Sequence, residues 1–276
     1  MTYLFVALFG LVFGSFLNVC IARIPLGLSI VHPRSKCPRC HHPIRWHDNI
    51  PVLSYAWLRG RCRDCREPIS IIYPLVEILN AALLLAAFMV DGLSLSFLRD
   101  AIFIMALLVL VFTDLFERRI PHVVTVPGIA IGLAFSWFVP VDSRPVVPVL
   151  LHYGVIPPLA LVSPIGAVTG GLVAGGLFYA VGELFYLVRR KEGLGFGDVM
   201  LMLMVGTFLG LPLALLTVLF GSLLGAVVGL PFELLSRKHR HFRWPYGSFL
   251  GAAGIYTCLW GNHWLDAYLR WTGLAG

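Results

Sequence analysis

The sequence predicts an all-α polytopic membrane protein with about eight transmembrane helices and one small tetracysteine loop domain. The first observation is composition: of 276 residues, 58% are hydrophobic and 13% are charged, and the mean hydropathy is +0.85. These values lie far outside the usual range of soluble domains. The second is a series of apolar segments that approach the roughly 20 helical residues needed to cross a bilayer core. The third is a single long hydrophilic stretch that holds four cysteines.

The apolar segments are separated by Gly, Pro or Arg clusters, and each is predicted to be one membrane span. They are 3–22, 71–90, 99–116, 122–139, 160–187, 198–211, 213–235 and 247–262. The chain is accordingly divided into a first transmembrane helix (1–23), a loop domain (24–70) and a membrane core (71–276). The first span is expected to be retained, because no basic segment precedes it and "CIARIPLG" offers no small-residue cleavage site.

One predicted span carries closely spaced glycines. "GAVTGGLVAGG" places Gly166 four residues before Gly170, and Gly171 four residues before Gly175. Small residues at this spacing let helices approach closely, so we expect a packing role. No internal repeat with a period of 20 to 50 residues is apparent.

The basic residues predict the orientation of the chain. Eighteen of the 21 Lys and Arg residues fall on alternate loops, in segments 23–66, 117–119, 189–191 and 237–243. By the positive-inside rule these loops are cytoplasmic, and both termini lie on the opposite side. The net charge of +7 is therefore a signal of topology. The lipid bilayer is the expected partner, and no nucleic acid is expected.

The loop domain carries a predicted metal site. Cys37 and Cys40 form one CxxC pair, and Cys62 and Cys65 form a second pair 21 residues further on. Four thiolates on two tight turns complete a tetrahedron, for which zinc is the expected ion, and the site is structural because no ligand position stays open. Disulfides are the alternative, but they rarely persist in the cytoplasm. A nearby histidine could replace one cysteine; the candidates are His41, His42 and His47.

Two acids at the ends of apolar segments are the candidate catalytic residues. Asp114 ends the third span and Asp198 begins the sixth, at the same predicted face of the membrane. Acids at membrane depth are costly and point to function. Two carboxylates that share one proton can polarise water and protonate a carbonyl, as in aspartic proteases. The alternatives are a helix cap at Asp198 and a snorkelling side chain at Asp114.

The glycines before Asp198, in "GLGFGD", are expected to serve the site. Because Gly193, Gly195 and Gly197 lack a Cβ atom, they allow unusual dihedral angles and let a substrate backbone come close to the loop. A helix that begins near Asp198 would add exposed N–H donors and partial positive charge.

Several segments together resemble the type IV prepilin peptidases, which are bifunctional leader peptidases and N-methyltransferases of the GxGD class of membrane aspartic proteases. The matching segments are "GSFLNVCIARIP" (14–25), "CPRC…CRDC", "YPLVEIL" (73–79), "TDLFERRIPHVVTVPG" (113–128), "GLGFGD" (193–198) and "PYGSFLGAAG" (245–254). They occur in order from the first span to the last, so the resemblance covers nearly the whole chain.

The resemblance implies a function and its partners. Asp114 and Asp198 would be the catalytic pair, acting on prepilins and pseudopilins of type IV pili or type II secretion. These substrates carry a short basic leader on the cytoplasmic side and are cut after a glycine. The second activity would methylate the new amino terminus with S-adenosylmethionine, and the cysteine loop is associated with it. A bacterial inner-membrane location is implied, with the loop and the active site facing the cytoplasm.

The resemblance also leaves questions open. Met200 stands where many members of the family carry a lysine, and Glu77 and Glu192 are further acids that could assist binding. Gly14, Ser15, Asn18 and Arg23 match the first-span motif without an assigned role. A peptidase without methyltransferase activity is one alternative function. A transporter or a non-catalytic membrane scaffold with a zinc loop is another.

Overall fold

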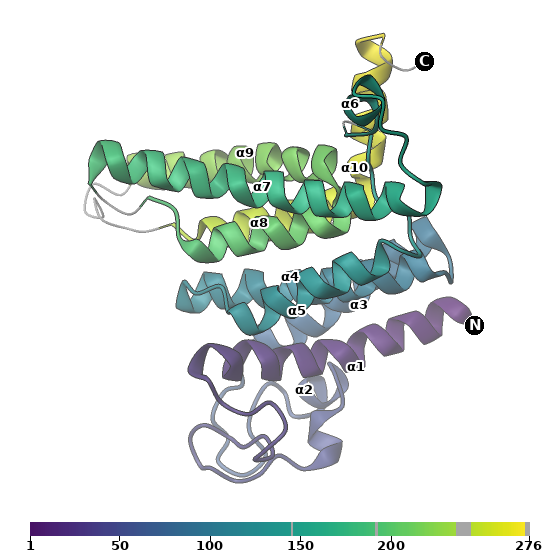
Figure 1. Cartoon of the computed structure of the whole chain (residues 1–276). Helices are drawn as coiled ribbons and strands as arrows, with labels where there is room; N and C mark the ends of the chain where they lie inside the picture. The colour runs from purple at the N-terminus through teal and green to yellow at the C-terminus, as the bar shows by residue number, and fades with distance from the viewer. Residues whose placement is uncertain (145, 191–192, 236–243, 274–276) are drawn as a thin grey trace. The chain divides into compact units, whose positions relative to one another are not determined.

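The computed structural model describes residues 1–144, 146–190, 193–235 and 244–273, which form helices and loops and no β-strand (Figure 1). The prediction of an all-α chain is confirmed. The described part divides into two compact units, Met1–Phe97 and Leu98–Gly276.

Every predicted span coincides with a helix. These helices are α1 (Thr2–Arg23), α3 (Ile72–Asp91), α4 (Leu95–Glu117), α5 (His122–Phe135), α7 (Leu159–Arg189), α8 (Phe196–Leu209), α9 (Leu211–Leu235) and α10 (Tyr246–Trp271). The remaining elements are short: α2 (Leu53–Trp57), α6 (Val146–His152) and the 3₁₀ turns η1 (Ile24–Leu26) and η2 (Trp46–Asn49).

Five of the described helices are long and apolar enough to cross a membrane, so the chain is a multi-pass membrane protein. They are α1, α3, α4, α7 and α9. Helices α5 and α8 are apolar but only 14 residues long. Such a helix extends about 21 Å, less than the hydrocarbon core of roughly 30 Å. Helix α10 is long enough, but its second half carries Asn262, His263 and Asp266. The number of crossings beyond five therefore stays a prediction.

In the first unit, α1 and α3 lie side by side because α1 presents glycines to α3. A Cβ atom at Gly10 would lie 2.6 Å from the Cα atom of Ala81, and one at Gly14 would lie 2.6 Å from the Cα atom of Glu77. Asn80, which is fully buried, donates its amide N–H to the carbonyl oxygen of Gly10 over 2.7 Å. Close backbone contact and one buried polar bond thus fix the register of the two helices.

In the second unit, α7 packs along α8 through the predicted small-residue stripe (Figure 1). A Cβ atom at Gly170 would lie 2.6 Å from the carbonyl oxygen of Gly206, and one at Gly175 would lie 3.0 Å from the Cβ atom of Leu203. These glycines therefore allow backbone contact between helices, which is the packing role that their spacing predicts.

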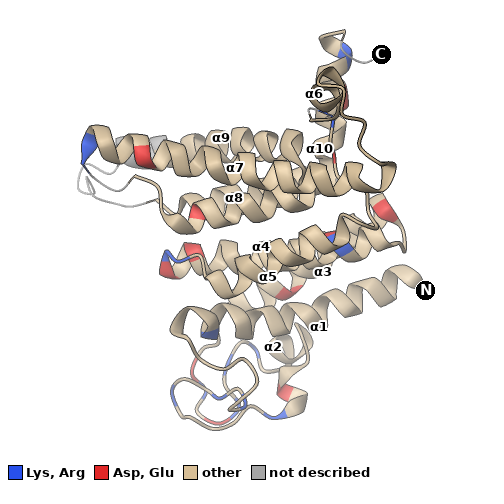
Figure 2. Cartoon of the chain, viewed as in Figure 1, with Lys and Arg blue, Asp and Glu red and all other residues tan. Residues whose placement is uncertain are grey.

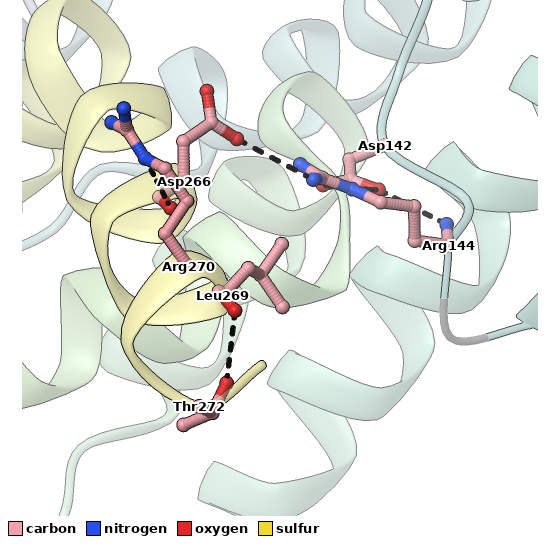
Figure 3. A network of polar contacts seen from close by, with 6 residues as sticks. All are labelled: Asp142, Arg144, Asp266, Leu269, Arg270 and Thr272. Atoms are coloured by element: carbon pink, nitrogen blue, oxygen red, sulfur yellow. Dashed lines mark hydrogen bonds and ion pairs between the residues drawn. The ribbon is translucent and has the colours of Figure 1, made fainter. Parts of the chain in front are cut away.

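A polar network ties the chain after α5 to the second half of α10 (Figure 3). Arg144 contacts the carboxylate of Asp142 over 2.7 Å and that of Asp266, on α10, over 3.6 Å. Beyond it, the hydroxyl of Thr272 donates to the carbonyl oxygen of Leu269 over 3.2 Å. The pair of Arg144 with Asp266 is exposed on both sides and contributes little stability, but it defines where this connection meets α10.

The packing of α7 on α8 can be tested with two glycine-to-alanine changes. We expect Gly206→Ala to lower the free energy of unfolding by about 1–3 kcal/mol, because its methyl group would overlap the backbone of Gly170. Gly176→Ala, on the partner helix α7, is the control because a Cβ atom there meets nothing within 4 Å. Thermal unfolding of both variants in the same detergent measures the difference. Equal midpoints would show that the close contact is absent.

Candidate functional site

The second unit brings the two candidate catalytic acids together. Asp114 lies in the last turn of α4 and is 7% exposed, and Asp198 is the third residue of α8. Both face Gly247, near the beginning of α10. A Cβ atom there would lie 3.1 Å from Oδ2 of Asp114 and 3.1 Å from Oδ1 of Asp198. The two carboxylate oxygens are therefore separated by no more than twice that distance.

Helix α10 holds Asp114 in place through Ser248. The backbone N–H of Ser248 donates to Oδ2 of Asp114 over 2.6 Å. The hydroxyl of Ser248 lies 3.0 Å from the same oxygen and 3.0 Å from the carbonyl oxygen of Val111. A hydroxyl has one proton, so the backbone N–H is the constant donor. Because the first N–H groups of a helix have no partner within it, the beginning of α10 is suited to bind a carboxylate.

The role of Ser248 was missed by sequence reasoning. The segment "PYGSFLGAAG" carries no signal of this role beyond its resemblance to the family. The available signal was local: Pro245 precedes an apolar segment and marks a helix beginning, so the next few N–H groups are free to bind an anion. Nothing in the sequence indicates which acid they meet.

Asp198 is held by its own loop. Its carboxylate accepts a hydrogen bond from the backbone N–H of Gly195 over 3.2 Å, and Gly195 is the N-cap of α8. Asp198 itself stands at the third helical position, so it is not the N-cap residue. The second oxygen, Oδ1, is the one that faces Gly247. One oxygen of Asp198 thus fixes the loop, and the other faces Asp114.

The glycines of "GLGFGD" act differently from the prediction. Gly195 has a φ angle of −77° and Gly197 lies within α8, so the expectation of unusual dihedral angles is wrong at these two positions. Two of the three are glycines because neighbours leave no room. A Cβ atom at Gly193 would overlap the ring of Phe185, and one at Gly197 would lie 2.8 Å from the Cβ atom of Ile120. Their small size lets the loop pack tightly before α8.

The two carboxylates have unequal surroundings. Asp114 accepts hydrogen bonds from both donors of Ser248, whereas Asp198 accepts one, from Gly195. Such donors stabilise a carboxylate more than a carboxylic acid. Two close acids can hold a single proton between them, and a water molecule beside them can be polarised by one acid while the other donates. The arrangement can therefore support hydrolysis by general acid–base catalysis.

The four predicted metal ligands also come together, in the first unit. The sulfur atoms of Cys37, Cys40, Cys62 and Cys65 all lie within 4.8 Å of one another. The sulfur atoms of Cys37 and Cys65 are 3.8 Å apart. A tetrahedron with metal–sulfur bonds of about 2.3 Å has edges of about 3.8 Å. The cluster can therefore hold a metal ion such as zinc.

The cluster is built from two copies of one turn. The backbone N–H of Cys37 donates to the carbonyl oxygen of His42 over 3.0 Å. In the same way, the backbone N–H of Cys62 donates to the backbone carbonyl oxygen of Glu67 over 2.8 Å. Cys62 follows Cys37 by 25 residues, and "SKCPRCHHPI" aligns with "GRCRDCREPI" at this offset. The loop thus contains an internal repeat that the sequence analysis missed, because each copy is only ten residues long and shares few identities.

The turn also prepares its first thiol for metal binding. The backbone N–H groups of Cys40 and Arg39 lower the pKa of Cys37 to about 7. The thiolate is the form that binds metal ions. Among the described residues, the cluster contains only cysteines, and no histidine takes part.

The first-span motif anchors this loop to the helices of its unit. Asn18 donates to the carbonyl oxygen of Tyr73 over 3.0 Å, at the beginning of α3. Arg23 donates to two carbonyl groups of the following loop, each over 2.8 Å. Glu77, on α3, accepts the N–H of Val52 over 2.8 Å. These contacts give the motif and Glu77 a structural role that sequence reasoning did not identify.

Other predicted features lie away from the two clusters or outside the described part. Met200 lies on α8, two residues after Asp198, and is half-buried. Glu192 and the basic segment 237–243, which contributes to the predicted orientation, lie outside the described residues.

Comparisons with known proteins identify the family that this chain resembles. Residues 8–90 match the Bacterial Peptidase A24 N-terminal domain, and residues 101–230 match the Type IV leader peptidase family. The chain is 35% identical to a prepilin leader peptidase/N-methyltransferase of Aeromonas hydrophila, over 96% of this chain and 92% of the relative. For proteins of the same name in Pseudomonas putida and Pseudomonas aeruginosa, identity is 34% and 33%. These two alignments cover 92% and 96% of this chain and 88% and 93% of the relatives. No solved structure matches this chain.

Removing one of the four cysteines is expected to abolish metal binding. We expect the purified wild-type chain to bind about one zinc ion, and Cys62→Ser to lose it, because three thiolates leave the tetrahedron incomplete. Cys258→Ser, on α10 in the other unit, is the matched control. Metal analysis by mass spectrometry after dialysis measures the stoichiometry. A full equivalent of zinc in Cys62→Ser would contradict a four-cysteine site.

Proposed function

Since the chain belongs to the type IV leader peptidase family, we propose that it cleaves the leader from prepilins or pseudopilins and methylates the new amino terminus. The single observation that carries the peptidase proposal is the convergence of Asp114 and Asp198 on Gly247. Two acids from helices far apart in sequence, one buried and one half-buried, form the constellation that water attack on an amide requires.

The unequal hydrogen bonding supports a division of roles. Asp114, held by Ser248, acts as the carboxylate that takes a proton from water, and Asp198 donates its proton to the carbonyl oxygen of the scissile bond. Hydroxide adds to the carbonyl carbon and gives a tetrahedral intermediate. As the carbon–nitrogen bond breaks, Asp114 passes its proton to the leaving amine, and Asp198 regains a proton from the intermediate's hydroxyl. Atoms and charge balance, and one proton remains shared by the pair.

The absence of a side chain at position 247 keeps space open between the acids. A methyl group there would lie within 3.1 Å of both carboxylates, in the region where a water molecule and the scissile carbonyl have to meet. Gly247 therefore contributes to the site because it has no side chain. Its backbone also begins the helix whose next residue, Ser248, binds Asp114.

The orientation of the substrate follows from charge. The positive-inside rule puts the loop domain and the acids on the cytoplasmic side of the inner membrane, where the substrate's leader begins. The substrate's apolar helix would approach from within the bilayer, so that its leader crosses the boundary near the acids. Cleavage at that boundary releases a short hydrophilic peptide and leaves the apolar helix in the membrane.

The second activity requires cofactors that the tetracysteine loop and the relatives' names imply. The four thiolates fit zinc in a closed site, which would stabilise the loop and leave no coordination position for a substrate. S-adenosylmethionine would supply the methyl group. The relatives named as prepilin leader peptidase/N-methyltransferase support this activity, and we assign no residue of this chain to the methyl donor.

Replacing either acid tests the proposed peptidase. We expect Asp114→Asn and Asp198→Asn to cut a prepilin in liposomes at least about 100-fold more slowly than wild type, because general acid–base catalysis is lost. Glu117→Gln, an exposed acid in the same turn of α4, is the matched control and should keep normal activity. Binding of the uncut prepilin is measured in parallel and should persist in all variants.

The outcome also separates this function from the alternatives. Near-normal cleavage by either Asp→Asn variant would exclude the paired mechanism. A wild-type chain that binds and cuts no prepilin would favour a transporter or a scaffold. Loss of methylation with intact cleavage on changing the four cysteines would divide the two activities between the units, and a wild type that cuts without methylating would indicate a peptidase only.

A further inference from the structure

The loop domain contains an arginine-lined depression that neither proposed activity uses. Its volume is about 760 Å³. The residues that line it come from α2 and from the second cysteine turn; they are Trp57, Leu58, Arg59, Arg61, Arg63 and Arg66. Figure 2 shows basic residues along the loop of this unit, whereas its two long helices are almost free of charge. We call this depression the arginine groove.

Each acid of the loop is paired with one arginine. Residues 24–70 contain three acids and eight basic residues. Asp48 accepts hydrogen bonds from Arg63, which hold the pKa of Asp48 below its usual range. The other two acids meet arginines outside the groove: Asp64 lies 3.9 Å from Arg45, and Glu67 lies 3.3 Å from Arg39.

Three guanidinium groups of the groove are left without an acid. In the part of the chain that the structure describes, Arg59, Arg61 and Arg66 form no ion pair with a carboxylate, and all three are exposed. A bound zinc tetrathiolate would carry two negative charges. Together with the three acids it would offset five of the eight positive charges, which leaves an excess of three.

We propose that the arginine groove binds a phosphate group, either of an anionic phospholipid headgroup or of a soluble phosphate compound. Arginine presents paired N–H donors that match phosphate oxygens, and several guanidinium groups at one depression are typical of phosphate sites. The excess positive charge disfavours the basic leader of a prepilin and the sulfonium group of S-adenosylmethionine. The groove is therefore distinct from the sites that the proposed function needs.

The position of the groove in its unit makes a headgroup accessible. The loop connects α1 to α3, both long and apolar enough to cross a membrane, so it lies at a membrane surface. Trp57, on the rim, is 84% exposed. Exposed tryptophans are enriched at the level of lipid headgroups, and basic residues there attract anionic lipids.

Native mass spectrometry of the full-length protein in detergent tests the proposal. The probes are phosphatidylglycerol, zwitterionic phosphatidylcholine and inorganic pyrophosphate. The test variant is Arg59→Gln/Arg61→Gln/Arg66→Gln. The matched control, Arg34→Gln/Lys36→Gln/Arg39→Gln, removes three positive charges from the same loop outside the groove. We expect the test variant to bind phosphatidylglycerol or pyrophosphate at least about tenfold more weakly than wild type, and the control to stay within about twofold.

The three probes distinguish a lipid headgroup from a soluble phosphate compound. Binding of phosphatidylglycerol alone identifies a lipid headgroup, whereas pyrophosphate that binds and competes identifies a soluble phosphate. Because three glutamines could unfold the loop, Arg59→Lys/Arg61→Lys/Arg66→Lys is measured too; it keeps the charge but loses the paired donors, and its binding should fall. Failure of wild type to prefer either anion over phosphatidylcholine, equal loss in the control, or unchanged binding in both test variants would overturn the proposal.

Discussion

The contact between Ser248 and Asp114, made by both the backbone N–H and the hydroxyl of Ser248, is the one on which the proposed site depends. It joins the end of α4 to the beginning of α10, two segments separated by 134 residues. Because Gly247 precedes Ser248, the same helix beginning that holds Asp114 also leaves the space into which Asp198 points. A shift of α10 by one residue would place a side chain between the acids and move the hydroxyl of Ser248 away from Asp114.

The second constraint is that α8 begins at the same place. One oxygen of Asp198 accepts the backbone N–H of Gly195, and the other lies toward Gly247 and Asp114. Two helix N-termini, each with unpaired N–H groups and partial positive charge, therefore meet the acidic end of α4. This concentration of donors offsets part of the cost of placing one buried and one half-buried acid in an apolar protein. Tight packing supports it, because Gly193 and Gly197 let the preceding loop lie against its neighbours.

Much of this arrangement could be predicted from the sequence, because the relevant signals are local. Long apolar segments predict helices, and CxxC spacing predicts the cysteine cluster. The position of two acids at the ends of apolar segments indicates Asp114 and Asp198 as a candidate pair. Contacts between distant segments were missed. The Ser248–Asp114 hydrogen bond depends on tertiary packing. The need for glycine at positions 193 and 197 also does, because it arises from contacts with Phe185 and Ile120 that local sequence does not reveal.

The two units carry different chemistry and rely on different stabilising contacts. In the first, the metal cluster needs four thiolates on repeated turns, and the anchors from Asn18, Arg23 and Glu77 tie the loop to α1 and α3. In the second, the acids need only helix ends and small residues. A change in the cysteine loop is therefore expected to leave the contacts around Asp114 and Asp198 intact, because the two clusters lie in different units.

The most direct test of the central claim is steady-state prepilin cleavage by Ser248→Ala and Ser248→Thr. The alanine variant keeps the backbone N–H but loses the hydroxyl near Asp114. If Ser248 positions Asp114, its kcat should fall about tenfold with KM unchanged, because a hydrogen bond to a charged group is lost, and threonine should restore most of it. An alanine variant with wild-type kcat, or a threonine variant as impaired as alanine, would contradict the account.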